Sequence, residues 1–206
     1  MSNTPRALPF PASEYVPRAE RTYDPTRCIV FCKTKELYGG FSNMAAGFPL
    51  MLDGTSIRTS EALYQTFRFP SHPEVQKAIL NERSPMSAKM VAKANVHKTR
   101  PDWEAVRVEA MWYSLRIKLA QNWTTFGDLL RSTEEKDIVE LSRRDGFWGA
   151  VKQSDGTLKG CNVLGILLGA LRWTASDAKG PGPVGEPTSL LPDALFLGRP
   201  IRGMDL

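Results

Sequence analysis

The residues best suited to chemistry fall into four short segments that are rich in glycine, aromatic and polar side chains. The first covers residues 33–44, where Gly39 and Gly40 allow the backbone to approach a ligand closely. Asn43 can read a base or ribose edge, and Lys33 can meet a phosphate or act as an amine nucleophile. The alternative interpretation is a solvated turn that carries surface lysines.

The second segment, residues 59–65, contains one glutamate at the start of a predicted helix. Glu61 falls in the first helical turn, where the helix dipole and free backbone N–H groups favour an ionised carboxylate. This position argues against a neutral general acid. It favours a base that activates water, or an anion placed against a developing oxocarbenium ion. The alternative is a glutamate on a solvated helix face.

The third segment, residues 145–149, places a tryptophan among glycines. The Trp148 ring can stack on a base, and Asp145 can accept hydrogen bonds from ribose hydroxyls or position water. A tryptophan that fills the hydrophobic core fits this segment equally well.

The fourth segment, residues 159–165, places Gly160 and Asn162 at a helix start. Free N–H groups at such a start can bind phosphate oxygens. Ordinary helix capping by the asparagine is the alternative.

Strands and helices must position these segments. Residues 28–32 are β-branched and aromatic and predict a buried strand, with the thiols of Cys28 and Cys32 on one face. Residues 48–52 and 55–58 flank Asp53 and Gly54, which favour a two-residue hairpin turn.

Most of the remaining domain is predicted to be helical. A helix capped by Thr59 or Ser60 runs to residue 69, and Pro73 and Pro85 each occupy a first helical position. A long buried helix covers residues 101–120, and shorter ones cover residues 126–131 and 162–173. In the last of these, Gly165 and Gly169 lie one turn apart and permit close backbone approach. The sum predicts an α+β fold, a helix-rich single domain with a small antiparallel sheet.

Composition bounds the remaining possibilities. The chain has 206 residues, 42% of them hydrophobic and 24% charged, with a net charge of +5. These values are typical of a soluble globular protein, and the longest apolar run, residues 163–173, is too short to span a membrane. With no signal peptide, we expect a cytoplasmic protein. The cysteines and histidines lack zinc spacing, so we expect no metal site.

Both ends of the chain are rich in proline. We therefore expect an extended or poorly ordered tail over residues 1–26, a working domain over residues 27–174, and a Pro/Gly-rich tail over residues 175–206. An apolar patch within residues 190–197 can dock on the domain.

Taken in order, six motifs resemble those of the NADAR (YbiA-like) family. They occupy residues 38–43, 59–65, 84–86, 102–107, 145–149 and 160–168. The resemblance implies an N-glycoside hydrolase with an α+β fold, without metal or cofactor. One branch of the family cleaves phosphoribosylamino intermediates of riboflavin synthesis. Another removes ADP-ribose from guanine in DNA and acts as the antitoxin of a DarT-type ADP-ribosyltransferase.

Two departures favour the second branch. Ala62 and Leu63 stand where many members have histidine and an aromatic residue, and Lys33 stands where the riboflavin branch has serine. A lysine at this position can attack the anomeric carbon and hold the opened sugar as a Schiff base, or it can simply bind pyrophosphate.

The resemblance and the four segments together assign roles. As catalytic residues we expect Glu61, Lys33 and Asp145. As substrate-binding residues we expect Tyr38, Gly39, Ser42, Asn43, Tyr64, Gln65, Trp103, Trp148, Gly149, Gly160 and Asn162. The expected substrate is ADP-ribosylated guanine in DNA. A riboflavin intermediate, or an ADP-ribose or NAD ligand that is bound without cleavage, is the alternative. We expect Glu61 and Trp148 to meet in one sugar-sized cleft.

Overall fold

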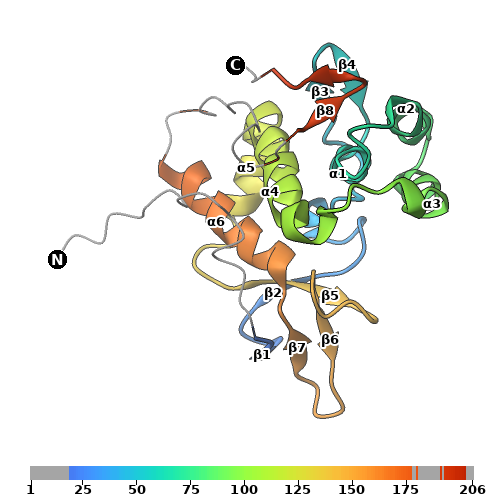
Figure 1. Ribbon diagram of the computed structural model, residues 1–206. Coiled ribbons are helices and arrows are strands. Elements are labelled where there is room, and N and C mark those ends of the chain that lie inside the picture. Colours follow the sequence, from blue (N-terminus) through green and yellow to red (C-terminus); the bar gives the residue numbers. More distant parts are fainter. Residues whose placement is uncertain (1–18, 178–179, 181–190, 192, 203–206) are drawn as a thin grey trace. The chain divides into compact units, whose positions relative to one another are not determined.

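The computed structural model describes residues 19–177, 180, 191 and 193–202 (Figure 1). The chain divides into two compact units. The first unit combines residues up to 42 with residues 123–180, and it contains a five-stranded sheet with two helices. The second unit combines residues 43–122 with the segment after residue 180, and it contains four α-helices with two small hairpins.

The sheet of the first unit is mixed, with the strand order β1-β7-β6-β5-β2. Its strands are β1 (Arg21–Tyr23), β2 (Ile29–Phe31), β5 (Ile138–Ser142), β6 (Ala150–Lys152) and β7 (Leu158–Gly160). The pairs β2–β5 and β5–β6 are parallel, whereas β6–β7 and β7–β1 are antiparallel. The α+β class is therefore confirmed. The parallel pairs were not expected, because they join segments distant in sequence and leave no local turn signal.

The predicted hairpin of the second unit is confirmed. Strands β3 (Leu50–Leu52) and β4 (Thr55–Ile57) pair antiparallel, with Leu52 opposite Thr55. The two turn residues both have positive φ, 45° at Asp53 and 75° at Gly54. A type I′ turn requires this conformation, so the residue pair determines the hairpin locally.

The predicted helix starts at Ser60, Pro73 and Pro85 are confirmed, whereas the helices predicted from residues 101, 126 and 162 begin at Trp103, Trp123 and Val163. The helices are α1 (Ser60–Thr66), α2 (Pro73–Asn81), α3 (Pro85–Ala94), α4 (Trp103–Gln121), α5 (Trp123–Arg131) and α6 (Val163–Asp177), with short 3-10 turns η2 (Gly39–Phe41) and η3 (Val96–Lys98). The proline that opens α2 and the one that opens α3 each occupy the first turn.

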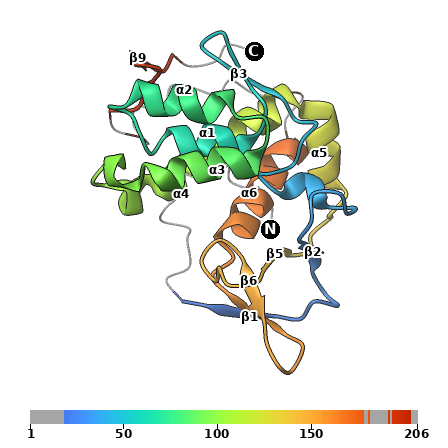
Figure 2. The same ribbon diagram turned by 90° about the vertical axis from the view of Figure 1, so that its right-hand side faces the viewer.

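Helices α1, α2 and α3 lie side by side (Figure 2), and α1 is buried along its whole length. The alternative interpretation, a glutamate on a solvated helix face, is therefore wrong.

The expected tails contain ordered strands. β1 begins at Arg21, ahead of the predicted boundary at residue 27. Beyond residue 174, the short strands β8 (Leu195–Phe196) and β9 (Arg199–Pro200) form a hairpin. The fully buried Gln76 holds this hairpin, because its Nε2 donates to the Leu195 carbonyl at 2.8 Å and its Oε1 accepts from the Leu197 N–H at 2.6 Å. The domain boundaries themselves stay a prediction.

Two further sequence expectations concern the cysteines and the membrane. Cys32 is exposed and lies just beyond β2, so the prediction that Cys28 and Cys32 are both buried is wrong. No helix within the described residues has the length and apolar character that a membrane span requires.

The two glycines of α6 differ in their surroundings. A Cβ atom at Gly165 would overlap the Ile138 carbonyl of β5, whereas nothing lies within 4 Å of a Cβ at Gly169. Close backbone approach is therefore a property of Gly165 alone, and the same expectation for Gly169 is wrong. The contact lets the helix lie directly on β5.

We predict that alanine has opposite effects at these two positions. Gly165→Ala should lower the free energy of unfolding by about 1–3 kcal/mol, because the methyl group forces the helix away from the sheet. Gly169→Ala, the matched control, should leave the stability unchanged or raise it by about 0.5–1 kcal/mol through its helix propensity. Urea denaturation of both variants measures the difference, and equal destabilisation would contradict the assigned contact.

Candidate functional site

The second unit places Glu61 in the first turn of a buried helix. Thr59 caps α1, since its hydroxyl oxygen accepts from the Ala62 N–H at 3.3 Å. The Glu61 N–H donates to the backbone carbonyl of Asn43 at 3.0 Å, which ties the helix start to the preceding segment. The Glu61 residue is only 6% exposed. The local sequence thus produces the helix start, and the packing around it removes the carboxylate from water.

Burial reverses the expected electrostatics of this carboxylate. Loss of hydration raises the pKa of Glu61 above its ordinary value, although Lys89, a hydrogen bond from Gln65, and Arg68 all act to lower it. The position at a helix start favours the ionised form of Glu61, whereas the desolvation that the tertiary structure adds acts in the opposite direction and outweighs it.

A polar chain leads from Glu61 toward the aromatic residues of the same unit. Gln65 Nε2 donates to Glu61 Oε1 at 2.8 Å, and Arg68 donates to Gln65 Oε1 at 3.3 Å. The Arg68 guanidinium lies 5.4 Å from the Trp103 ring centroid, and the Tyr64 and Trp103 rings lie 5.2 Å apart. The structure therefore brings together Glu61 and three predicted substrate-binding residues, and it orients the carboxylate through Gln65.

Two residues linked to the Glu61 backbone each carry a buried polar atom that has no hydrogen-bond partner in the described part of the chain. These atoms are the side-chain oxygen Oδ1 of Asn43 and the hydroxyl Oγ of Ser60. Both residues are almost fully buried, and the Asn43 amide nitrogen contacts Met111 Sδ at 2.6 Å. Because buried polar atoms normally have partners, these two atoms mark a place where a ligand or water can bind.

In the first unit, the segment after β2 forms a compact turn. The Lys33 side chain is exposed and lies 3.7 Å from a Glu36 carboxylate oxygen. Tyr38 stacks on Phe41 with ring centroids 5.9 Å apart, and a Cβ at Gly39 would overlap the backbone of residues 33 and 34. Gly39 is thus required for the turn itself, and Lys33 lies on a solvated surface.

Residues 145–149 form a second turn in the same unit. Asp145 Oδ1 accepts from the backbone N–H groups of Phe147 and Trp148, both at 3.0 Å. The Asp145 carboxylate thereby caps its own loop. Trp148 is half-buried and meets the Phe147 ring edge-on at 5.0 Å. The loop therefore holds the indole in a defined orientation.

The start of α6 binds this loop rather than presenting free donors. The N–H groups of Asn162, Val163 and Leu164 donate to the carbonyls of residues 149, 147 and 148 at 3.0–3.1 Å. The Asn162 side chain bridges β5, donating to the Ile138 carbonyl at 2.8 Å and accepting from the Glu140 N–H at 3.0 Å. It therefore does not cap its own helix. These donors position Trp148 and are not open to a phosphate.

Two glycines make this arrangement possible. A Cβ at Gly149 would lie 2.5 Å from the Glu140 carbonyl oxygen, and a Cβ at Gly160 would overlap the backbone of Gly149. Gly149 and Gly160 thus permit close strand packing, which is a structural reason for both predicted binding residues.

The parallel pairing of β2 and β5 brings the two loops of the first unit to one edge of the sheet. Phe31 of β2 lies opposite Glu140 of β5, and the strands run in the same direction. Because parallel neighbours end at the same edge, the Lys33 turn and the Trp148 loop both leave the sheet there. The expectation that Glu61 and Trp148 meet in one cleft stays a prediction.

Sequence reasoning missed Lys118 on α4. This lysine is fully buried, and its ammonium lies 4.5 Å from the Phe48 ring centroid. Burial lowers the pKa of Lys118 to about 7, so a large part of the amine is neutral near physiological pH. The signal in the sequence was a lysine within a helix that is otherwise predicted to be buried all round.

No group of three or more metal-binding side chains occurs within the part of the chain that the structure describes.

Comparison with known proteins identifies several relatives of this chain. The N-glycosidase YbiA of Escherichia coli (strain K12) is 35% identical over 144 residues, covering 70% of this chain and 86% of that protein. The chloroplastic riboflavin biosynthesis protein PYRR of Zea mays is 28% identical, covering 79% of this chain and 28% of that protein. An NMR structure of the E. coli protein YbiA superposes with a TM-score of 0.61 at 31% identity, covering 73% of this chain and 86% of that one.

The NADAR domain matches residues 30–174, which include the Glu61 helix, the Lys33 turn and the Trp148 loop. Together with the agreement in fold, this match shows that the chain belongs to the NADAR domain family.

Proposed function

We propose that this chain is an N-glycosidase that releases ADP-ribose from guanine in DNA. The observation that carries the proposal is the buried Glu61 carboxylate, together with a buried polar atom without a partner on each of two residues linked to its backbone, Asn43 and Ser60. The names of the YbiA relatives support cleavage of an N-glycosidic bond. Lys33 and Ala62, which match the guanine-directed branch that the sequence resembles, favour the modified base as substrate. A DarT-type ADP-ribosyltransferase is then the enzyme whose product this chain removes.

Glu61 provides the acid–base chemistry in this proposal. Cleavage of the bond between the ribose C1 atom and nitrogen passes through an oxocarbenium-like state that an anion stabilises. A carboxylate with a raised pKa is also a stronger base toward the attacking water. Gln65 fixes one carboxylate oxygen and leaves the other to the reaction.

The remaining predicted residues bind and orient the substrate. We assign the Asn43 Oδ1 atom to a ribose hydroxyl or base N–H, because it is a buried acceptor without a partner. Trp148 stacks on a base, and the Tyr38–Ser42 turn contacts the sugar or base. Asp145 and Asn162 act indirectly, since their side chains hold the loop that carries Trp148.

An amine provides the covalent variant of this mechanism. Its nitrogen displaces guanine from C1, and the exocyclic amine leaves with the proton that the attacking amine gives up. The resulting glycosylamine opens its ring as the C1–O4′ bond breaks and O4′ takes the remaining nitrogen proton, which gives an imine that water hydrolyses to the sugar and the free amine. Lys33 was the predicted nucleophile, but it is exposed beside Glu36. We therefore propose Lys33 as an electrostatic partner of the substrate, and as the attacking amine if the covalent variant operates.

A second candidate function is hydrolysis of a riboflavin intermediate. The similarity to proteins named for riboflavin biosynthesis in Zea mays and Vibrio vulnificus favours it.

The deciding experiment incubates the chain with DNA that carries ADP-ribosylated guanine, and with the phosphoribosylamino intermediate, and measures the released sugar. Release of ADP-ribose from the DNA is expected. Turnover of the small intermediate alone would select the second function. Binding of ADP-ribose without any product would indicate a non-catalytic module. Quenching with borohydride and mapping the adduct by mass spectrometry identifies the amine, if a covalent imine forms.

We predict that Glu61→Gln lowers the rate of ADP-ribose release about 10²- to 10⁴-fold, the usual effect of losing a general base. The rate of the wild type should rise with pH through a pKa above 4.5, the ordinary value for glutamate. A pH profile of kcat measures both effects.

The same substitution should stabilise the protein at neutral pH. The folded-state pKa of Glu61 is raised, so its favourable contribution is complete below pH 4.5 and is lost as pH rises through the folded pKa. Glutamine removes this penalty, so the melting temperature should exceed that of the wild type at pH 7 and converge with it in acid. Glu135→Gln, on an exposed residue, is the control and should change neither property. Full activity of Glu61→Gln would refute the catalytic role.

We predict that Asp145 acts through the loop rather than on the substrate. Asp145→Asn retains an oxygen that can accept the N–H groups of Phe147 and Trp148, so kcat and KM should stay near the wild-type values. Asp145→Ala removes the hydrogen bonds that hold the loop, so Trp148 is no longer fixed in place. We expect KM to rise by roughly 5- to 100-fold, where the upper value corresponds to complete loss of one stacking contact. A large fall in kcat for Asp145→Asn would instead show direct participation of the carboxylate.

A further inference from the structure

The outer face of helix α3 carries two methionines and two lysines in one stripe. We call the α3 stripe the set Met86, Lys89, Met90 and Lys93, which follow the spacing i, i+3, i+4 and i+7. All four residues are exposed, with Met86 at 57% and Met90 at 55%. The opposite face, with Ala88 and Ala92, packs against the neighbouring helices. An ordinary solvated helix face carries mainly polar side chains. The exposed face of α3 instead combines two methionines with two lysines.

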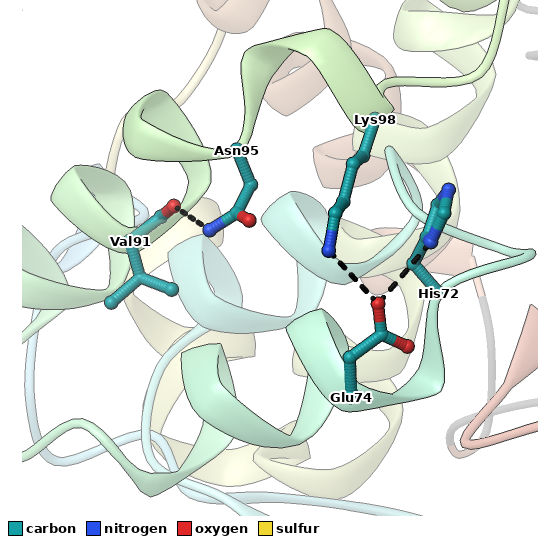
Figure 3. Close-up of polar contacts among 5 residues, drawn as sticks. All are labelled: His72, Glu74, Val91, Asn95 and Lys98. Atoms are coloured by element: carbon teal, nitrogen blue, oxygen red, sulfur yellow. Dashed lines mark hydrogen bonds and ion pairs between the residues drawn. The ribbon is translucent and has the colours of Figure 1, made fainter.

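The charge of this region is not balanced locally. Residues 83–101 include lysines, arginines and a histidine but no aspartate or glutamate. Lys98 is paired with Glu74, which also contacts His72 (Figure 3), and Arg100 is paired with Asp102. Neither Lys89 nor Lys93 forms an ion pair with any residue that the structure describes. The stripe therefore presents two positive charges that no ion pair neutralises.

The stripe lies next to the buried carboxylate of the candidate site. The Lys89 charge is the largest influence that lowers the pKa of Glu61, although Lys89 is exposed and Glu61 is buried. Helices α1 and α3 pack directly against each other (Figure 2). Lys89 is thus on the solvent side of Glu61, and a chain that runs along the stripe passes close to the carboxylate.

We propose that the α3 stripe is a binding surface for single-stranded DNA that flanks the modified nucleotide. This inference rests on the proposed function, because it assigns the polymeric part of that substrate to a surface. Lys89 and Lys93 are one helical turn apart, about 6 Å along the axis, and they neutralise phosphates. Met86 and Met90 provide the apolar surface on which unstacked bases lie.

A single strand matches the stripe better than other anionic partners. It presents phosphates and apolar base faces together, whereas an acidic peptide offers charge without such faces. The stripe has only two cations and no aromatic side chain, which is weak for insertion into a membrane surface. A base must also leave a duplex before its linkage to a sugar can reach a buried carboxylate.

The test measures binding of the full chain to a fluorescently labelled, unmodified single-stranded oligonucleotide by anisotropy over a range of salt concentrations. The double variant Lys89→Gln with Lys93→Gln should bind on the order of tenfold more weakly at low salt. Its slope of log Kd against log salt should fall by about 1.4, the value expected for two lost phosphate contacts on a single strand. Met86→Ser with Met90→Ser should weaken binding and leave this slope unchanged.

The control variant has the same net charge as the variant that lacks Lys89 and Lys93. Lys77→Gln with Lys152→Gln removes two exposed lysines elsewhere, on α2 and β6, and should retain most of the affinity. Equal weakening by the control would show a general charge effect and overturn the inference. So would binding to anionic phosphatidylserine vesicles that is as tight and as dependent on Lys89 and Lys93.

Measurements of ADP-ribose release from a polymeric and a small substrate test the DNA-binding surface separately from the proposed glycosidase activity. Lys93→Gln should raise KM for ADP-ribosylated DNA several-fold and leave turnover of ADP-ribosylated guanosine unchanged. If no ADP-ribose is released from either substrate while the stripe still binds DNA, the proposed function fails and the surface stands. If release occurs but both substrates respond equally to Lys93→Gln, the surface is wrong and the glycosidase stands.

Discussion

Removal of the Glu61 carboxylate from water is the constraint on which the candidate site depends. A buried charge is costly unless polar groups surround it, and Gln65, Arg68 and Lys89 supply that compensation. The compensation is incomplete, since the pKa of Glu61 remains raised. Such an imbalance lowers stability and increases basicity, and functional sites commonly show this combination.

Helix α1, which carries Glu61, is short and lacks a solvated face. The segments packed around α1 therefore influence the pKa of the Glu61 carboxylate more than the sequence of α1 does. The Asn43 carbonyl binds its first turn, and α2, α3 and α4 pack around it. Lys89 connects this interior to the outer surface of α3. If the α3 stripe binds DNA, phosphates near Lys89 would weaken its effect on Glu61 and raise the pKa of the carboxylate further.

The first unit uses its polar groups differently. Asp145, Asn162 and the N–H groups at the start of α6 all bind backbone atoms around the Trp148 loop. Residues that the motifs marked as candidates for binding thus form the frame for one aromatic side chain. The frame explains why glycine is needed at positions 149 and 160, where a side chain would collide with adjacent backbone.

The sequence by itself determined the locally encoded features: the turn at Asp53 and Gly54, the helices that begin at Pro73 and Pro85, and the order of the family motifs. Each depends on the conformation of a few neighbouring residues. Only the tertiary structure decided the parallel pairing of β2 with β5, the burial of Glu61 and Lys118, and the partners of Asn162. Desolvation and long-range hydrogen bonds arise from segments far apart in the chain, so no local pattern could reveal the pKa direction of Glu61.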